Sequence, residues 1–355
     1  MRRGLMAWDA EEIPRNALQE RVHRLQAAMA HAGIDAMIVY TNFIRSAAVS
    51  YLTAFSPYWA DGMLLVPRDG EPVFATTLSK RVGSWIQTVK PIGDLVTSPN
   101  PGTVLGKRLA EIANVRRIAI LELDKFPGGL YDELSAALPN IEFIDGTETF
   151  GKARGSLDEV EARLVRKADA IAQQALQSLN PKDCNLGEAV GTVEKIARLH
   201  GAEEVYIAIA ADLDSNRRFL RLSGNRALGR RFAIRATIAY KGNWVRSTKA
   251  YSMDERDRAT IARADARFKE MLSHIDSHQP LVDQIRNISS IATDDWLIEA
   301  ASGTTPLAVI ASSKDAGRNL HHGPALIVSA NATIENVPWC GAGVAAFGES
   351  MSRAA

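Results

Sequence analysis

A run of basic residues in the second half of the chain is the feature best suited to chemistry. The stretch from Ser215 to Lys249 spans 35 residues with no Asp or Glu, and it holds eight arginines and two lysines. The whole chain has 42 basic and 41 acidic residues, so the run is a local feature. A guanidinium stays protonated and carries five donors in a fixed plane, which suits bidentate binding of a carboxylate or phosphate. Two arginines of the run could therefore form an anion site. The others lie at turns and strand ends, where we expect a solvated rim rather than a nucleic-acid groove: Arg217, Arg218, Arg221, Arg226, Arg230 and Arg231.

Two arginines of this run, Arg235 and Arg246, lie in adjacent segments with strand character. Because side chains alternate along a strand, both arginines are predicted on one face of the sheet. The residues expected on that face are Arg235, Thr237, Trp244, Arg246 and Thr248. We expect the two guanidiniums to hold an anionic substrate there, with Trp244 beside it. An internal salt-bridge network is the alternative, and its candidate acids are Asp212, Asp214, Glu299 and Glu335.

Histidine, the usual proton carrier near neutral pH, is scarce in this chain. His321 and His322, in RNLHHG, could place one imidazole in the site as a general base, and an exposed loop pair is the alternative. His274 and His278 have the spacing of a metal pair on a helix, but no third ligand lies near them. We therefore interpret the pair as residues at a helix C-terminus, where imidazolium suits the helix dipole.

Length and composition bound the class of protein. A chain of 355 residues is long enough for two domains, and 46% hydrophobic and 23% charged residues are ordinary for a globular protein. The net charge of +1 argues against a nucleic-acid or membrane partner. The N-terminal residues have no apolar stretch typical of a signal peptide, and Cys184 with Cys340 makes no disulfide framework. We therefore expect a cytoplasmic protein in which Cys340 is a buried thiol.

The first 150 residues alternate between helix and strand patterns. Strands are predicted at 36–40, 62–67, 71–78, 116–123 and 141–145, with helices ending near Gly33 and Leu138 and others near 79–88 and 103–113. This alternation is typical of an α/β domain with a largely parallel or mixed sheet. We expect this first domain to span residues 1–150.

The second domain, expected over residues 155–355, follows a short glycine-containing joint. Ser156 and Glu159 have the spacing of a capping box, which predicts a helix with a buried stripe. That stripe is Val160, Leu164, Ala168, Ile171, Ala175 and Leu179. A helix at 187–199, strands at 204–210, 218–224, 231–240 and 243–252, helices at 255–274 and 281–290, and strands at 325–330 and 341–348 follow. This order predicts an α+β domain with a curved, mostly antiparallel sheet.

This order of segments resembles the creatinase, prolidase and aminopeptidase P family, and the resemblance covers residues 12–348. The segments that carry it are RVHRLQAAMAHAGIDAMIVY, YLTAFSP, GMLLVPRDGEPVFAT, EVEARLVRKADAIAQQAL and RFAIRATIAYKGNWVRSTKAYS. The resemblance implies a creatinase-like N-terminal α/β domain followed by a pita-bread C-terminal domain. In that family two aspartates, a histidine and two glutamates hold two divalent ions.

The metal ligands of the family are replaced in this sequence. The resemblance puts the two aspartate positions on Arg235 and Arg246, and an arginine cannot ligate a metal. Neither histidine expected near 214–224 and 302–307, nor the glutamate expected near 343–348, is present. Glu335 lies near the position of the remaining glutamate. We therefore expect no metal and no other cofactor.

The resemblance leaves two functions open. The first is a metal-independent hydrolase, in the manner of creatinase, that cleaves a C–N bond in a small carboxylate-bearing compound. The second is a non-catalytic pseudo-peptidase subunit that partners an active paralogue. In creatinase-type dimers the N-terminal domain of one subunit reaches the cavity of the other, and Tyr58 and Trp59 lie on the corresponding loop. We expect a homodimer, or a heterodimer with a paralogue; packing within one subunit is the alternative role for these two aromatic residues.

Overall fold

The computed structural model describes most of the chain. The described residues are 8–56, 60–112, 114–155, 157–221, 224–275, 293–301, 307–314 and 325–345. Two compact units divide the chain, Arg2–Gly155 and Ser156–Ala355. Within the described ranges, no helix has the length and apolar character needed to cross a membrane.

The first unit is a six-stranded mixed sheet with the strand order β4-β3-β2-β1-β5-β6. Its strands are β1 (Ala36–Thr41), β2 (Gly62–Pro67), β3 (Val73–Thr76), β4 (Asp94–Thr97), β5 (Arg117–Ile120) and β6 (Glu142–Asp145). Its helices are α1 (Arg15–His31), α2 (Ala47–Thr53), α3 (Gly83–Val89), α4 (Pro101–Ala110), α5 (Gly128–Ala137) and α6 (Thr147–Arg154). Only β2 runs against its neighbours in this sheet. The predicted α/β architecture is confirmed.

The second unit is a seven-stranded antiparallel sheet, with the order β11-β10-β12-β13-β9-β8-β7. Its strands are β7 (Glu204–Ala210), β8 (Arg231–Tyr240), β9 (Asn243–Ser252), β10 (Thr293–Ala300), β11 (Val309–Ser312), β12 (Leu326–Ile334) and β13 (Val337–Val344). Its helices are α7 (Glu159–Gln177), α8 (Leu186–Leu199) and α9 (Glu255–Ser273). The predicted α+β plan with an antiparallel sheet is confirmed.

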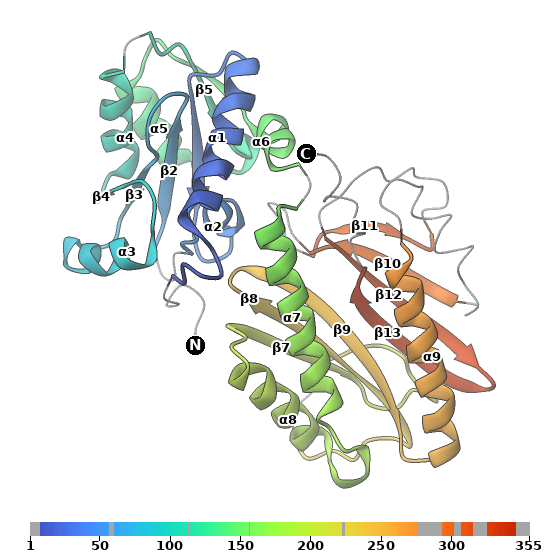
Figure 1. Ribbon diagram of the computed structural model, residues 1–355. Coiled ribbons are helices and arrows are strands. Elements are labelled where there is room, and N and C mark those ends of the chain that lie inside the picture. Colours follow the sequence, from blue (N-terminus) through green and yellow to red (C-terminus); the bar gives the residue numbers. More distant parts are fainter. Residues whose placement is uncertain are drawn as a thin grey trace. The chain divides into compact units, whose positions relative to one another are not determined.

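Helices α7 and α9 lie along one face of this sheet (Figure 1). The whole predicted stripe of α7, from Val160 to Leu179, is buried. Gly343 in β13 allows α9 to approach closely, since a Cβ there would lie 2.9 Å from Cδ1 of Leu272. The glycine-rich end of the chain is therefore a helix-packing surface.

Two local predictions need correction, and a third lies outside the described residues. The N-cap of α7 is Asp158, whose side chain accepts a hydrogen bond from the Glu161 N–H, whereas Ser156 lies outside the described residues. The predicted strand at 218–224 is wrong for its described residues, 218–221 and 224, which form no ladder and make one isolated bridge, Leu220 with Ile209 of β7. The predicted helix at 281–290 lies outside the described residues.

Candidate functional site

The strand pair β8–β9 brings the two arginines to one face. Arg235 lies opposite Thr248, and Thr237 lies opposite Arg246. Each arginine donates through Nε to the threonine beside it, at 3.4 Å for Arg235 with Thr248 and 3.2 Å for Arg246 with Thr237. We call the face formed by Arg235, Thr237, Trp244, Arg246 and Thr248 the arginine face. The alternation seen in the sequence is confirmed.

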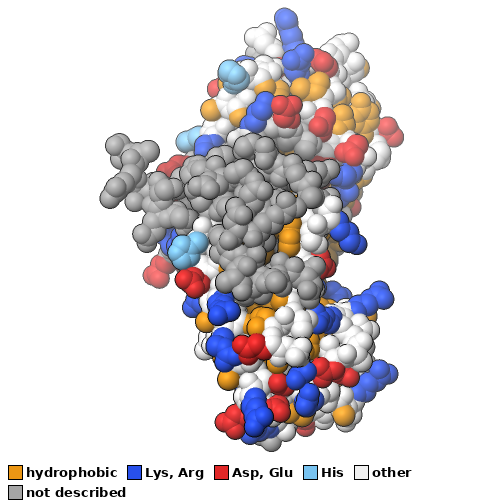
Figure 2. Space-filling model, turned by 90° about the vertical axis from the view of Figure 1, so that its right-hand side faces the viewer, with side chains coloured by type: hydrophobic (Ala, Val, Ile, Leu, Met, Phe, Trp, Pro, Cys, Tyr) orange, Lys and Arg blue, Asp and Glu red, His pale blue; other side chains and the backbone are white. Residues whose placement is uncertain are grey.

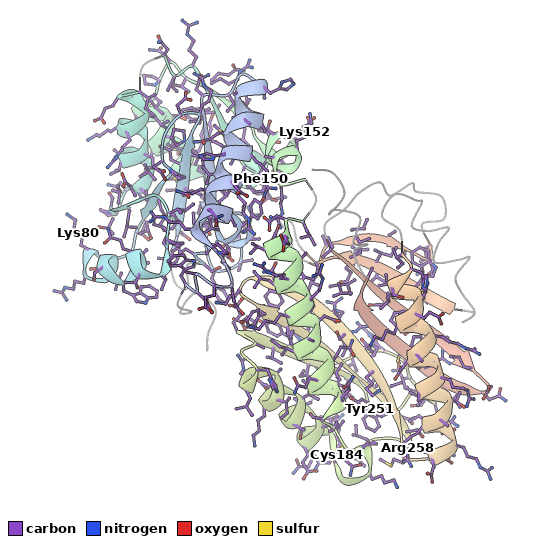
Figure 3. All side chains as sticks on the ribbon, viewed as in Figure 1. Lys80, Phe150, Lys152, Cys184, Tyr251 and Arg258 are labelled. Carbon is purple, nitrogen blue, oxygen red and sulfur yellow. The ribbon has the colours of Figure 1, made fainter. Side chains whose placement is uncertain are left out.

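The opposite face of the same strands packs on α7 and α9. Ser247 donates to Asp169 of α7 at 2.9 Å, and Tyr251 donates to the Leu176 carbonyl at 2.6 Å. Tyr251 lies between the sheet and α7 (Figure 3), and burial raises its pKa well above the usual range. The arginine face is therefore the side of β8 and β9 turned away from these helices.

Arg246 has a carboxylate partner. Its Nη1 donates to both oxygens of Glu299 on β10. The Glu299 side chain is 3% exposed and that of Arg246 is 19% exposed, so the pair is largely removed from water. Strands β13 and β12 lie between β9 and β10, so this ion pair crosses the arginine face. Of the two interpretations that the sequence left open, Arg246 shows the salt bridge.

Arg235 is in a different electrostatic environment. Its guanidinium carbon lies 4.0 Å from the centroid of the Phe219 ring. None of the described carboxylates lies within ion-pair distance of it. Burial lowers the pKa of Arg235, the neighbouring Arg246 cation lowers it further, and Glu299 acts in the opposite direction. An arginine nevertheless stays charged, so Arg235 is a largely desolvated cation with no ion pair to any described carboxylate.

Aromatic rings lie beside the arginines. Tyr206 of β7 is opposite Thr237, and its ring stacks on Trp244 with centroids 5.8 Å apart and planes at 13°. The guanidinium of Arg221 lies 4.8 Å from the Tyr206 centroid. These rings give the arginine face a planar, partly apolar border, which suits the unreactive part of a small ligand.

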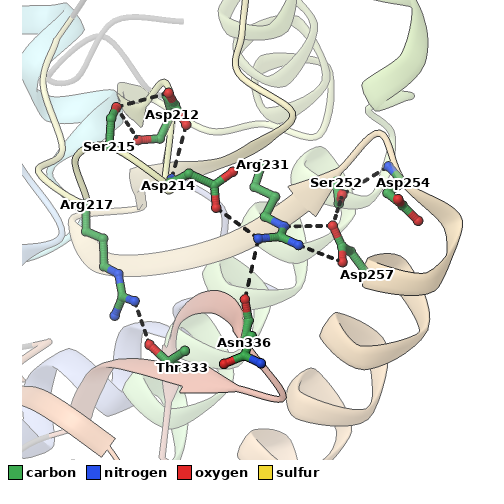
Figure 4. Close-up of polar contacts among 10 residues, drawn as sticks. All are labelled: Asp212, Asp214, Ser215, Arg217, Arg231, Ser252, Asp254, Asp257, Thr333 and Asn336. Atoms are coloured by element: carbon green, nitrogen blue, oxygen red, sulfur yellow. Dashed lines mark hydrogen bonds and ion pairs between the residues drawn. The ribbon is translucent and has the colours of Figure 1, made fainter.

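The remaining basic residues of the run were expected to form a solvated rim, and Arg231 departs from that expectation. Its side chain is 13% exposed and is held between Asp214 at 2.9 Å and Asp257 at 2.7 Å (Figure 4). Hydrogen bonding to Asp257 is the main cause that raises the pKa of Arg231. On the face drawn in Figure 2, basic and acidic side chains are interspersed among the described residues. This mixture of charges argues against a binding groove for a polyanion such as nucleic acid on that face.

Glu335, one of the candidate acid partners of Arg235 and Arg246, lies apart from them and binds other residues. It occupies the tight turn between β12 and β13, where Glu335 and Asn336 both have positive φ, 51° and 63°. Its carboxylate accepts from Arg263 at 2.7 Å and from Thr260 at 3.1 Å, and both partners belong to α9. The turn geometry thus directs Glu335 toward the helix-covered side.

Four of the predicted site residues cannot be placed. His321, His322, Tyr58 and Trp59 lie outside the described residues. Among the other candidates, Cys340 is buried, and burial raises the pKa of its thiol to about 12. A protonated thiol is a weak nucleophile, so Cys340 is unsuited to covalent chemistry near neutral pH.

The described side chains do not offer a set of ligands suited to a divalent cation. No group of three or more His, Cys, Asp or Glu side chains suited to a metal occurs within the described ranges. On the arginine face the carboxylate of Glu299 is already bound to Arg246, and two guanidiniums repel a cation. The chemistry of these side chains favours an anion.

Two features of the structure have no counterpart in the sequence reasoning. One is Ser329 on β12, whose hydroxyl is buried without a hydrogen-bond partner in the described structure. The other is a pocket of about 610 Å³ in the first unit, at the ends of β1 and β3. Its lining residues are Asn42, Phe43, Ile44, Ala60, Asp61, Thr77, Leu78 and Ser79. No local sequence pattern marks either feature, because both arise from strand pairing.

Comparison with known proteins gives a domain match and a fold. Residues 21–155 match the family described as the Creatinase/Prolidase N-terminal domain. The X-Pro aminopeptidase of Thermotoga maritima has a similar structure, with a TM-score of 0.67 and 16% identity over 91% of this chain and 96% of that one. The prolidase of Pyrococcus horikoshii has a TM-score of 0.67 and 16% identity, over 92% of this chain and 94% of that one. The His350Ala aminopeptidase P of Escherichia coli has a TM-score of 0.65 and 13% identity, over 93% of this chain and 92% of that one. No curated protein sequence matches this chain.

Proposed function

We propose that this chain, whose first unit is a Creatinase/Prolidase N-terminal domain in a prolidase-like fold, is a metal-independent hydrolase. Its substrate is a small carboxylate-bearing compound, and the bond cleaved is a C–N bond. The observation that carries the proposal is Arg235, a desolvated guanidinium with no described carboxylate at ion-pair distance. A substrate carboxylate at this position supplies the missing charge and two parallel hydrogen bonds.

The other residues of the arginine face have roles that follow from their contacts. The ion pair with Glu299 holds Arg246 beside Arg235 and neutralises its charge, so Arg235 supplies the net positive charge that the ligand meets. Trp244, stacked on Tyr206, borders the ligand. Tyr58 and Trp59 close the site across a dimer interface. His321 or His322 takes a proton from the attacking water and returns it to the leaving nitrogen as the C–N bond breaks.

A non-catalytic subunit is the second candidate, and the Arg246–Glu299 pair supports it. A buried salt bridge across the arginine face fills space that a substrate would otherwise occupy. In this alternative the chain pairs with an active paralogue in the cytoplasm and lends it the loop that carries Tyr58 and Trp59. Sedimentation of the purified chain, alone and mixed with such a paralogue, distinguishes a homodimer from a heterodimer.

The test combines metal analysis with an assay of amine release. We expect the dialysed protein to carry less than one zinc, manganese, cobalt or iron ion per chain. We expect it to release amine from small N-acyl or amide carboxylates in the presence of a chelator. A double variant, His321→Ala with His322→Ala, should keep carboxylate binding and lose turnover. Stoichiometric metal, or activity that a chelator abolishes, contradicts the proposal; binding without turnover by the wild type favours the non-catalytic subunit.

A further inference from the structure

Ser329 is a buried polar group with no described partner. It lies in β12, is 8% exposed, and its Oγ has no hydrogen bond in the described structure. Buried hydroxyls are nearly always hydrogen-bonded in folded proteins, because an unpaired one loses its interactions with water and regains nothing. A side chain of this kind is what a bound ligand would satisfy.

Strand register places Ser329 in the same row as Arg235. Arg235 lies opposite Thr248, Thr248 lies opposite Ala342, and Ala342 lies opposite Ser329. Directly opposed residues of antiparallel strands point to the same face, so Ser329 belongs to the arginine face. Only the small side chain of Ala342 separates Ser329 from Thr248 in that row. A ligand bound at Arg235 and long enough to pass Ala342 would therefore reach the serine.

The spacing of the strands sets the length of that ligand. The hydrogen bond of 3.4 Å from Arg235 Nε to Thr248 Oγ1 places the guanidinium near β9. Ser329 is two strands farther, which is roughly 10 Å at the usual strand separation. A hydrogen bond of about 2.9 Å at each end leaves about 4–5 Å between the two polar ends of the ligand. A chain of four carbons has that length.

The hydroxyl of Ser329 determines which chemical group the ligand should carry at the end opposite its carboxylate. A hydroxyl donates one hydrogen bond and accepts others, so it complements a carbonyl and an N–H together. It offers no charge to balance a second buried ion. Its neighbours in the row, Ala342 and Leu297, are apolar. A neutral amide fits these surroundings better than a second carboxylate or an ammonium group.

We propose that the ligand of the arginine face is a four-carbon carboxylate with a neutral amide at its other end. Its carboxylate binds Arg235 and its amide binds Ser329. This inference rests on the proposed carboxylate site and narrows it to a substrate class. The amide C–N bond is then the bond that water cleaves, which leaves a dicarboxylate and ammonia.

Calorimetric titration of the full chain with two probes tests the inference. Succinamate carries the amide, and butyrate has the same number of carbons but ends in a methyl group. We expect the wild type to bind succinamate more tightly than butyrate. Ser329→Ala should weaken succinamate binding about three- to tenfold, the usual worth of one neutral hydrogen bond, and leave butyrate unchanged. Arg235→Ala should weaken both probes.

The matched control is Ser247→Ala, which removes a serine hydroxyl from the other face of the same sheet and should leave the ratio of the two affinities unchanged. If both probes bind through Arg235 and Ser329→Ala changes neither, or both equally, the amide assignment is overturned and the carboxylate site stands. If the wild type binds neither probe, the carboxylate site fails with it. Ser329→Ala should fold as the wild type does, since it removes only an unpaired hydroxyl, and an unaltered melting temperature verifies this.

Discussion

The two faces of the seven-stranded sheet differ in whether their polar side chains have partners among the described residues. On the helix-covered face, Ser247 binds Asp169, Lys249 binds Asp265, and the Trp339 indole donates to Asp265 at 2.8 Å. On the arginine face, Arg235 has no described carboxylate at ion-pair distance and Ser329 has no described hydrogen-bond partner. Both sets of residues come from the same sheet, so the contrast arises from what each face contacts.

This contrast separates structural polar groups from those available to a ligand. A satisfied group contributes to stability whether or not a ligand is present, and an unsatisfied one gains only when a ligand binds. Arg246 belongs to the first class because of Glu299, although it is on the arginine face. The two arginines that look equivalent in the sequence therefore have different roles.

The largest expected effect is on Arg246. Replacing it with Ala leaves the buried Glu299 carboxylate without its partner and should lower the free energy of unfolding by about 3–5 kcal/mol. Lys249→Ala breaks a more exposed pair, with side chains 31% and 30% exposed, and should lower it by about 1 kcal/mol or less. Urea denaturation of the two variants gives both values. The double variant Arg246→Met with Glu299→Leu should recover most of the loss; equal losses for Arg246→Ala and Lys249→Ala would remove the distinction.

A buried cation that can lose its proton offers a second comparison with Arg235. Lys90 in the first unit donates to the Ile92 carbonyl at 2.6 Å, and burial lowers its pKa from 10.5 to about 8. Between these two values the unfolded chain holds a proton that the folded chain has released, so stability rises with pH. We expect a gain of about 2 kcal/mol from pH 7.5 to 9.5. It should be absent in Lys90→Met.

The range from pH 7.5 to 9.5 separates the effect of Lys90 on stability from that of Tyr251. The raised pKa of Tyr251 acts in the opposite direction, because the unfolded tyrosine ionises first and stability then falls above about pH 10. Denaturation at pH 7.5 and 9.5, with wild type and variant side by side, avoids this contribution. A variant with the same pH dependence as the wild type would show that Lys90 is not the group responsible.

The smallest effect is a difference of sign between two serines. Ser247→Ala removes a hydrogen bond to the half-buried Asp169 and should lower stability by about 1 kcal/mol. Ser329→Ala removes an unpaired buried hydroxyl and should leave stability unchanged or raise it by up to about 1 kcal/mol. Differential scanning calorimetry resolves both changes. A clear loss in Ser329→Ala would mean that this hydroxyl is satisfied in the free protein.

Local patterns predicted a large part of the fold. The alternation along β8 and β9 placed Arg235 and Arg246 on one face, and the apolar stripe of α7 is buried as expected. The predicted strands at 62–67 and 204–210 match β2 and β7. These features depend on side-chain periodicity within one element, which a sequence displays directly.

Local sequence patterns could not predict which distant strands pair with each other. Glu299 could only be named among several acids, because its contact with Arg246 joins residues 53 apart through the order of four strands. Strands β10 and β11 were not predicted, and the described residues of the expected strand at 218–224 make one bridge in place of a ladder. Ser329 reaches the row of Arg235 only because β13 pairs with β9. Each of these depends on which strands become neighbours.

The most direct test of Arg235 as a carboxylate site is the thermal stability of wild type and Arg235→Ala over a panel of small carboxylates. We expect carboxylates to stabilise the wild type, by about 2.7 kcal/mol at 100 times the dissociation constant. Arg235→Ala should lose this gain and keep its stability without ligand, because it removes a desolvated cation that has no described carboxylate partner. A wild type indifferent to every carboxylate, together with an Arg235→Ala variant that is strongly destabilised without ligand, would show that Arg235 is not a carboxylate site.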